Sequence, residues 1–185
     1  MPHSPPPAPL LPPSPRKNKS RESPFALKVG SAPKDWFYQP AKPPALVDLF
    51  EPPIGPYFVY GTLMDPGMLA DVLGLEHQPE LRPAKIEGYS CKLWGQYPAM
   101  QDGSRGVQVS GKVYRVESVA HAKRLAEYET NSYEAKPCLI QYTDGKHPVQ
   151  DYGHVFMFVG NTHDIQDGEF NLETWLKRMG RQPTT

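Results

Sequence analysis

The sequence contains little cysteine, no excess of either charge and no long apolar run, and each of these absences excludes a class of protein. Its two cysteines, Cys91 and Cys138, are far apart and lack metal-ligand spacing, so neither a disulfide framework nor a zinc site is predicted. The 20 Lys and Arg residues balance 20 Asp and Glu residues, which leaves no net positive charge to attract nucleic acid or an anionic membrane. No apolar window approaches membrane-spanning length, and the N-terminus lacks the pattern of a secretory signal. We therefore expect a cytoplasmic protein that acts on a small molecule, without a nucleic-acid or membrane partner; the sequence does not indicate its oligomeric state.

Proline, in contrast, is abundant and concentrated in the N-terminal part of the chain. Most of the 23 prolines lie in residues 1–55, together with the basic cluster Arg16–Arg21. This composition shows neither helical nor strand periodicity, and it cannot bury enough apolar surface to offset the entropy lost on ordering a chain. We predict a disordered, proline-rich leader over residues 1–55 and a folded domain over residues 56–180.

Helix caps and β-rich runs define the elements of that domain. Asp65 as N-cap, Pro66 at the first helical position and Gly74 just past the end predict one helix, and Ser118 begins a second. A third helix is expected over Leu172–Met179, closed by Gly180. Strands are predicted from β-branched and aromatic content over Ala84–Trp94, Val107–Val116, Pro137–Tyr142 and Gly153–Val159. The order lacks strict βαβ alternation, so the fold class is α+β with a mixed or barrel-like sheet.

The run from Tyr57 to Leu63 predicts an anion-binding turn after a strand. Gly61 has no Cβ, so its backbone can adopt a positive φ and approach a bound group closely. The successive amides of Thr62 and Leu63 then form a concavity suited to negative charge. The alternative is a plain junction between a strand and a turn.

Glu129 is the candidate catalytic residue. It lies where the second helix is expected to end, and the partial negative charge of a helix C-terminus should raise the pKa of its carboxyl group. A carboxylate with a raised pKa can accept and return a proton near neutral pH; the alternative is a solvated surface charge. Glu127 is assigned to the surface, and Tyr133 either hydrogen-bonds into the site or packs within a strand.

Tyr97 and Pro98 form a second candidate segment. Proline fixes φ, and an aromatic residue before proline favours a cis bond, so the pair could form a rigid pocket wall. The alternative is a simple turn between two strands, followed by the polar turn of residues 101–106.

Together these segments resemble the gamma-glutamylcyclotransferase-like family. The resemblance spans residues 57–159, continues weakly to Met179, and rests on Tyr60-Gly61-Thr62-Leu63, Tyr97-Pro98-Ala99, the strand from Gly106 to Tyr114, and Leu125 to Glu129 with Tyr133. It implies a small mixed β-barrel flanked by helices, with the turn Tyr60, Gly61, Thr62 and Leu63 binding substrate. Tyr97, Pro98 and Tyr133 are the further substrate-binding candidates from the residues themselves.

The resemblance also implies the reaction and its proton acceptor, Glu129. The α-amine of a γ-glutamyl compound attacks its own γ-carbonyl and releases 5-oxoproline and an amine or amino acid. The chemistry needs no metal, nucleotide or other cofactor, because one carboxylate can serve as base and then acid.

One departure from the family pattern leaves substrate preference open and favours one of two alternatives to the enzyme. Many members carry arginine two residues after the tyrosine matched to Tyr133, whereas this chain has Ala135 followed by Lys136. The first alternative is a module that binds γ-glutamyl compounds or a protein without turnover. The second is a hydrolase using Cys138 or a Ser–His pair, although no nucleophile elbow is present.

Overall fold

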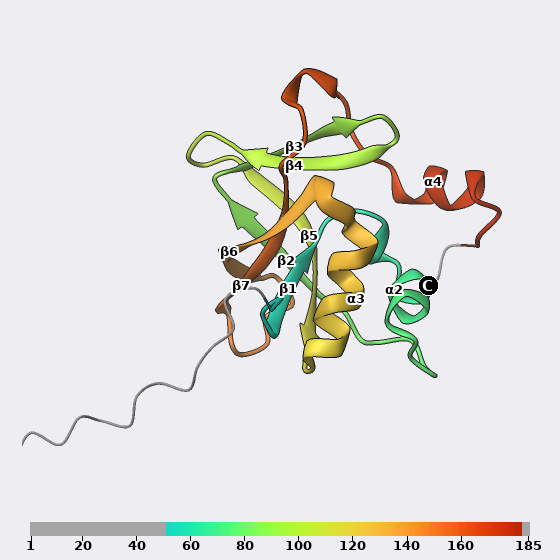
Figure 1. The fold of residues 1–185 in the computed structure, drawn as a ribbon. Helices are drawn as coiled ribbons and strands as arrows, with labels where there is room; N and C mark the ends of the chain where they lie inside the picture. The colour runs from blue at the N-terminus through green and yellow to red at the C-terminus, as the bar shows by residue number, and fades with distance from the viewer. Residues whose placement is uncertain (1–50, 183–185) are drawn as a thin grey trace, which may run out of the picture. The chain divides into compact units, whose positions relative to one another are not determined.

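The computed structural model describes residues 51–182, so the predicted leader falls almost wholly outside the described residues. A closed five-stranded barrel forms the centre of the fold (Figure 1). In barrel order its strands are β1 (Gly55–Val59), β5 (Gln108–Val116), β2 (Arg82–Glu87), β6 (Tyr133–Tyr142) and β7 (Gln150–Phe158). Neighbouring strands pair antiparallel except β1 and β7, whose parallel pairing closes the barrel. The predicted α+β class with a mixed barrel is confirmed.

A three-stranded sheet lies beside one end of the barrel (Figure 1). Its strands are β4 (Tyr97–Asp102), β3 (Tyr89–Trp94) and β8 (Ile165–Gln166). The prediction of one strand over Ala84–Trp94 was wrong, because Gly88 adopts a φ of 87° and divides the run into β2 and β3. Pro98 lies within β4 instead of a turn, and the cis peptide bond in residues 51–182 precedes Pro148, not Pro98.

The predicted helix caps are present. Helix α2 (Pro66–Leu73) follows the short 3-10 helix η1 (Thr62–Met64), and its N-cap Asp65 accepts a hydrogen bond from the Met68 N–H at 2.8 Å. In helix α3 (Val119–Glu129) the Ser118 hydroxyl accepts from the His121 N–H at 3.2 Å. The remaining helical segments are η2 (Thr130–Ser132), η3 (Thr162–Asp164) and α4 (Leu172–Arg178). Within residues 51–182, no helix combines the length and apolar character needed to cross a membrane.

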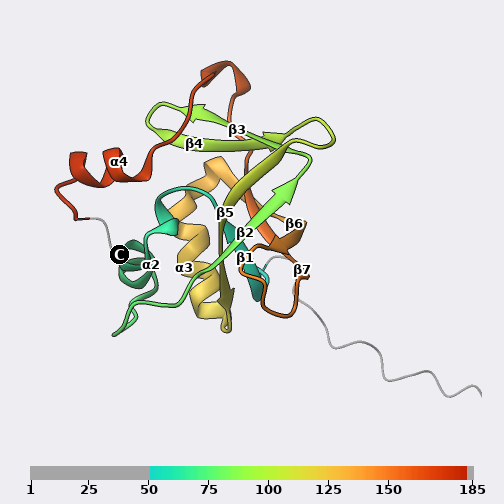
Figure 2. The same cartoon turned by 180° about the vertical axis from the view of Figure 1, so that it is seen from behind.

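The core has two main layers, separated by the barrel wall. Phe58 is fully buried inside the barrel. Its neighbours Tyr57 and Val59 are buried on the other side of the strand, in the cluster formed with α2 and α3. This alternation follows from the period of two in a β-strand. Helix α3 lies in front of the barrel in Figure 1, and the rear view in Figure 2 turns β2 and β5 toward the viewer instead. Helix α4 adds a third, smaller cluster through Trp175 and Leu176.

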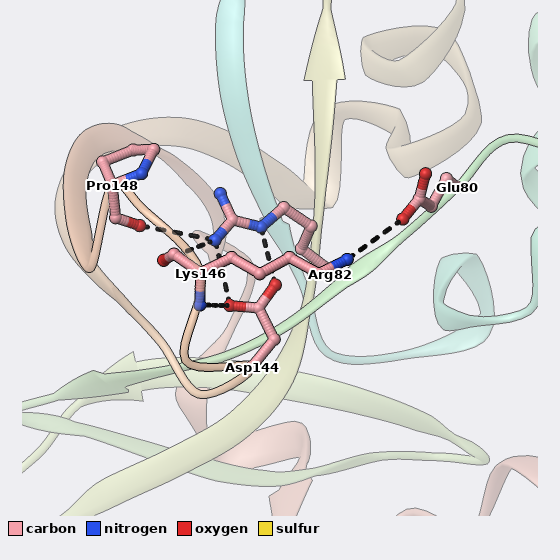
Figure 3. A network of polar contacts seen from close by, with 5 residues as sticks. All are labelled: Glu80, Arg82, Asp144, Lys146 and Pro148. Carbon is pink, nitrogen blue, oxygen red and sulfur yellow. Dashed lines mark hydrogen bonds and ion pairs between the residues drawn. The ribbon is translucent and has the colours of Figure 1, made fainter.

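An arginine clamp ties the β6–β7 loop to the start of β2 (Figure 3). The Arg82 guanidinium donates to both carboxylate oxygens of Asp144, at 2.8 and 3.0 Å, and to the carbonyl oxygens of Lys146 and Pro148 at 3.1 and 3.4 Å. It also lies 3.7 Å from the centroid of the Tyr142 ring. Such a planar, bidentate contact is specific to arginine, and it holds the loop beside the barrel.

The clamp predicts a pH-dependent contribution to stability. The hydrogen bonds from Arg82 hold the pKa of Asp144 well below its usual range. The stabilisation is therefore complete above the ordinary Asp pKa of about 3.9 and is lost as the pH falls through the lower, folded-state pKa. We expect Asp144→Asn to lower the thermal midpoint at pH 7, and the difference from wild type to shrink toward pH 2.

Thermal melts followed by circular dichroism across that range test the prediction. Asp167→Asn is the matched control, because the Asp167 carboxylate pairs with Lys92 at 2.8 Å but is 91% exposed. Exposed single ion pairs contribute little, so an equal loss in both variants would contradict the structural role of the clamp.

Candidate functional site

A cavity of about 430 Å³ lies where the ends of β1 and α3 meet the start of β4 and helix α4. All eight residues predicted from the sequence line it: Glu129, Tyr60, Gly61, Thr62, Leu63, Tyr97, Pro98 and Tyr133. Three chain segments separated by at least 30 residues thus contribute to one pocket. The cavity volume is in the usual range of small-molecule sites, about 300–1,000 Å³.

The turn after β1 lines this cavity and continues into a short helix. In η1 the Met64 N–H donates to the Gly61 carbonyl at 3.0 Å, and the Asp65 N–H donates to the Thr62 carbonyl at 3.2 Å. Thr62 and Leu63 are the first residues of this short helix. Their N–H groups therefore have no acceptor within the helix. Both residues line the cavity, so the turn can offer their N–H groups to an anionic or oxyanionic ligand atom.

Glycine is required at position 61 for a different reason from the one predicted. The φ of Gly61 is −127°, so the expected positive φ was wrong. A Cβ built at Gly61 would instead lie 2.7 Å from Cγ of Pro98, a residue that is buried. The Pro98 carbonyl in turn accepts a hydrogen bond from the Tyr133 hydroxyl at 3.0 Å. Close approach of the turn to β4 therefore excludes a side chain at residue 61.

This contact predicts a coupled pair of substitutions. Gly61→Ala should lower the free energy of unfolding by about 1–3 kcal/mol, because the proline ring must shift to accommodate the methyl group. Pro98→Ala removes the colliding atom, so the double variant should be more stable than the sum of the two single effects implies. Thermal or denaturant unfolding of the four proteins measures this coupling, and strict additivity would show that the contact is not the constraint.

Glu129 is the last residue of α3 and is half-buried at the pocket. Burial raises the pKa of its carboxyl group from 4.5 to about 7. The direction agrees with the prediction, and its physical cause here is loss of hydration within the fold. Glu127, two residues earlier, is exposed as expected.

Tyrosine hydroxyls surround this carboxyl group and the turn. The Tyr60 hydroxyl donates to the Phe156 carbonyl at 2.6 Å, and the hydroxyls of Thr62 and Tyr128 are 2.8 Å apart. Burial, followed by the charge of Glu129, raises the pKa of both Tyr60 and Tyr133. These phenols therefore stay protonated at neutral pH and remain hydrogen-bond donors.

Thr130, directly after Glu129, has a strained backbone. Its φ of 61° and ψ of −174° lie in a region that is almost confined to glycine. Its hydroxyl accepts a hydrogen bond from the Ser132 N–H at 3.3 Å. The chain passes here from the last residue of α3 to the first of β6, Tyr133, with only η2 between them. The strained residue thus lies where the chain turns from α3 into β6, and the residues on either side of this turn, Glu129 and Tyr133, both line the pocket.

Replacing Thr130 by glycine should relieve this strain. Strain of this kind costs about 1–3 kcal/mol, and glycine costs about 0.5–1 kcal/mol in added chain entropy. We expect Thr130→Gly to raise the free energy of unfolding by about 1 kcal/mol, although the bond to Ser132 is lost. Asn131→Gly is the matched control: it adds the same entropy at a neighbour without a positive φ, so it should be destabilising. Denaturant unfolding compares them, and equal losses would refute the strain.

Several pocket residues were not among the predicted site residues. Tyr128 is adjacent to Glu129, and Trp94 precedes the Tyr97 segment, so proximity in sequence to predicted residues could have indicated both. Trp175 of α4 and Met179 directly after that helix, in contrast, line the cavity because this last helix returns to it. No local pattern distinguishes them from ordinary core residues of an amphipathic helix.

The departure at Ala135 lies outside this pocket. Ala135 pairs with Phe156 across β6 and β7 and lines a separate hollow with Glu51, Pro52 and Pro53. Burial raises the pKa of Cys138 to about 12 within the barrel core, which leaves its thiol protonated and unsuited to act as a nucleophile. Within residues 51–182, no cluster of three or more His, Cys, Asp or Glu side chains could hold a metal ion.

A family model described as "Gamma-glutamyl cyclotransferase, AIG2-like" matches residues 57–177. The chain therefore belongs to this family, and the predicted family is confirmed. No curated protein matches the chain significantly.

Solved structures show the same fold. Two Arabidopsis thaliana proteins with solution structures are 27% and 26% identical, with TM-scores of 0.52 and 0.54; the alignments cover 69% and 70% of this chain and 83% and 76% of theirs. The crystal structure of an AIG2-like protein from Mus musculus is 19% identical, with a TM-score of 0.52 over 71% of this chain and 96% of that one. At this identity the mouse protein supports the fold alone.

Proposed function

We propose that this protein is a γ-glutamyl cyclotransferase whose catalytic domain spans residues 56–180 and which acts in the cytoplasm. Family membership suggests cyclotransferase activity in general. The observation that carries the specific proposal is the placement of Glu129, with a pKa of about 7, in the same cavity as the Gly61–Leu63 turn. A proton acceptor and a set of backbone donors are the two groups that the cyclisation requires.

The proposed reaction begins with the neutral α-amine of a γ-glutamyl compound. Its nitrogen attacks the γ-carbonyl carbon and forms the new ring bond, while Glu129 accepts the proton that the nitrogen loses. The negative charge on the former carbonyl oxygen, or the substrate α-carboxylate, is bound by amides of the Gly61–Leu63 turn; each charge-assisted hydrogen bond contributes about 1.5–3 kcal/mol. The bond from the γ-carbon to the leaving nitrogen then breaks, and Glu129 returns the proton to that nitrogen.

The products are 5-oxoproline and an amine or amino acid, and no further reactant is consumed. The two reacting groups belong to one molecule, so the enzyme has to orient them and move a proton. A pKa near 7 suits both halves of that task, because the carboxyl group is then readily available in either protonation state at neutral pH. The reaction as proposed uses no metal or cofactor.

Glu129→Gln tests the catalytic assignment through two opposite effects. The amide preserves the shape of the side chain but cannot carry the proton, so we expect turnover to fall by roughly 10²-fold or more while binding persists. Stability should move the other way. The folded-state pKa of Glu129 is raised, so burying the protonated carboxyl group is favoured over burying the ionised one. The stability that Glu129 contributes is therefore complete below the unfolded pKa of about 4.5 and is lost as the pH rises through about 7.

The glutamine side chain cannot ionise, so the Glu129→Gln variant does not lose stability as the pH rises. At pH 8 it should be more stable than wild type by about 1–3 kcal/mol, with little or no gain at pH 4. Production of 5-oxoproline from a panel of γ-glutamyl amino acids, γ-glutamyl amines and glutathione, together with thermal midpoints at both pH values, measures the two effects. Glu127→Gln is the control, since Glu127 is exposed on the same helix. Retained turnover with a lowered midpoint would make Glu129 a structural residue.

A module that binds γ-glutamyl compounds without turnover is the second candidate. The feature that favours it is Ala135, at a position where the family resemblance implies arginine in many members. Ala135 lines a neighbouring hollow that shares Thr130, Tyr133 and Phe156 with the cavity around Glu129. Calorimetric binding of γ-glutamyl compounds by a wild-type protein that forms no 5-oxoproline would support this candidate over the enzyme.

A further inference from the structure

The walls of the pocket differ sharply in chemistry. The Gly61–Leu63 turn and Glu129 supply donors and the proton acceptor, whereas much of the remaining surface is aromatic. Glu129 is the one residue with a formal charge among those that line the cavity in the described part of the chain, and no Lys, Arg or His joins it. A bound molecule therefore meets both a few polar groups and several aromatic rings.

Three elements supply the aromatic wall, which we define as Trp94 of β3, Tyr97 of β4 and Trp175 of α4. The ring centroids of Tyr97 and Trp175 are 6.3 Å apart, with the planes at 57°. Trp94 lies 5.4 Å from the Phe158 ring and 6.3 Å from the Tyr133 ring in tilted and edge-on arrangements. Aromatic rings favour such tilted and edge-to-face contacts, so the wall is suited to receive another ring in the same manner.

Helix α4 places one ring of this wall. Trp175 is 7% exposed and packs with Leu176 and Met68. Its buried Nε1–H has no hydrogen-bond acceptor within residues 51–182, so packing alone determines where the indole lies. Tyr97, at 36% exposed, is the outer ring and remains open to solvent.

The proposed reaction determines which part of a substrate can reach this wall. Glu129 has to reach both the attacking and the leaving nitrogen, while the amides of the turn bind charged oxygens of the glutamyl portion. The group attached to the leaving nitrogen is then the part that remains to occupy the rest of the cavity, where the rings lie.

We infer that the aromatic wall selects γ-glutamyl compounds whose leaving amine carries an aromatic ring, and that Trp175 is the main specificity-determining residue. This inference rests on the proposed cyclotransferase function. The aromatic ring is the chemistry recognised; the amine that carries it is either an arylalkylamine or an aromatic amino acid.

Four substrates test the inference in matched pairs. γ-Glutamylphenethylamine is compared with γ-glutamylethylamine, and γ-glutamylphenylalanine with γ-glutamylalanine, by kcat/KM for release of 5-oxoproline. We expect the aromatic member of at least one pair to be favoured at least about tenfold, the discrimination typical of an apolar pocket. The pair with the larger ratio identifies the amine source. Ratios near or below one in both pairs would overturn the inference while leaving the cyclotransferase function intact.

Substitutions then locate the selectivity. Trp175→Leu should reduce the aromatic-to-aliphatic ratio at least fivefold, and Trp175→Phe, which keeps a ring, should restore most of it. Tyr97→Leu is the second variant if the helix α4 substitution impairs folding, since the half-open Tyr97 side chain contributes less to the core. Tyr152→Leu, at a tyrosine that is 80% exposed outside the pocket, controls for loss of an aromatic residue. A ratio that survives loss of both pocket rings would refute the wall as the determinant.

Binding separates failure of this inference from failure of the proposed function. Calorimetry of Glu129→Gln with γ-glutamylphenethylamine and γ-glutamylethylamine needs no turnover. If wild type forms no 5-oxoproline but the variant binds the aromatic compound at least about tenfold more tightly, the enzymatic proposal fails and the aromatic site stands. Equal affinities overturn the aromatic site whether or not wild type is active.

Discussion

The parallel pairing of β1 with β7 is the constraint on which the arrangement of the site depends. It brings the first strand of the domain beside the last strand of the barrel, with Phe58 opposite Val155. The Tyr60 hydroxyl reinforces the pairing by donating to the Phe156 carbonyl at 2.6 Å in a buried position. Because β6 pairs with β7 along its whole length, closing the barrel also fixes the start of β6, and with it Tyr133. The turn at Gly61 and the end of α3 therefore meet only in the closed barrel.

The elements with local signals could be predicted from the sequence. Asp65, Ser118 and Gly74 act as caps in the structure because capping depends on residues only a few positions apart. The strand boundaries were less accurate. Gly88 ends β2 through a positive φ that a run of strand-forming residues conceals, and β6 begins at Tyr133, four residues before the predicted start.

The candidate site shows the same division between local and distant information. The residues predicted to line it do so, yet two of the physical reasons differ. Gly61 is needed because Pro98 approaches from another strand, and the pKa of Glu129 is raised by burial, a cause that the sequence argument did not include. Both causes involve distant segments, so neither can be deduced from a short motif. Trp175 was missed for the same reason, since α4 reaches the pocket only through tertiary packing.

The charge composition of the pocket links the properties of Glu129 to the aromatic wall. A lysine or arginine beside the carboxyl group would stabilise its ionised form and lower its pKa toward or below the usual value. Glu129 would then be a weaker base. Among the described residues that line the cavity there is no cation, and the aromatic side chains that line it likewise offer no counter-charge. The lack of a cation in the cavity is thus consistent with a pKa of Glu129 near 7, and it also leaves the proposed leaving-group region without a charge that would favour an anionic substrate group.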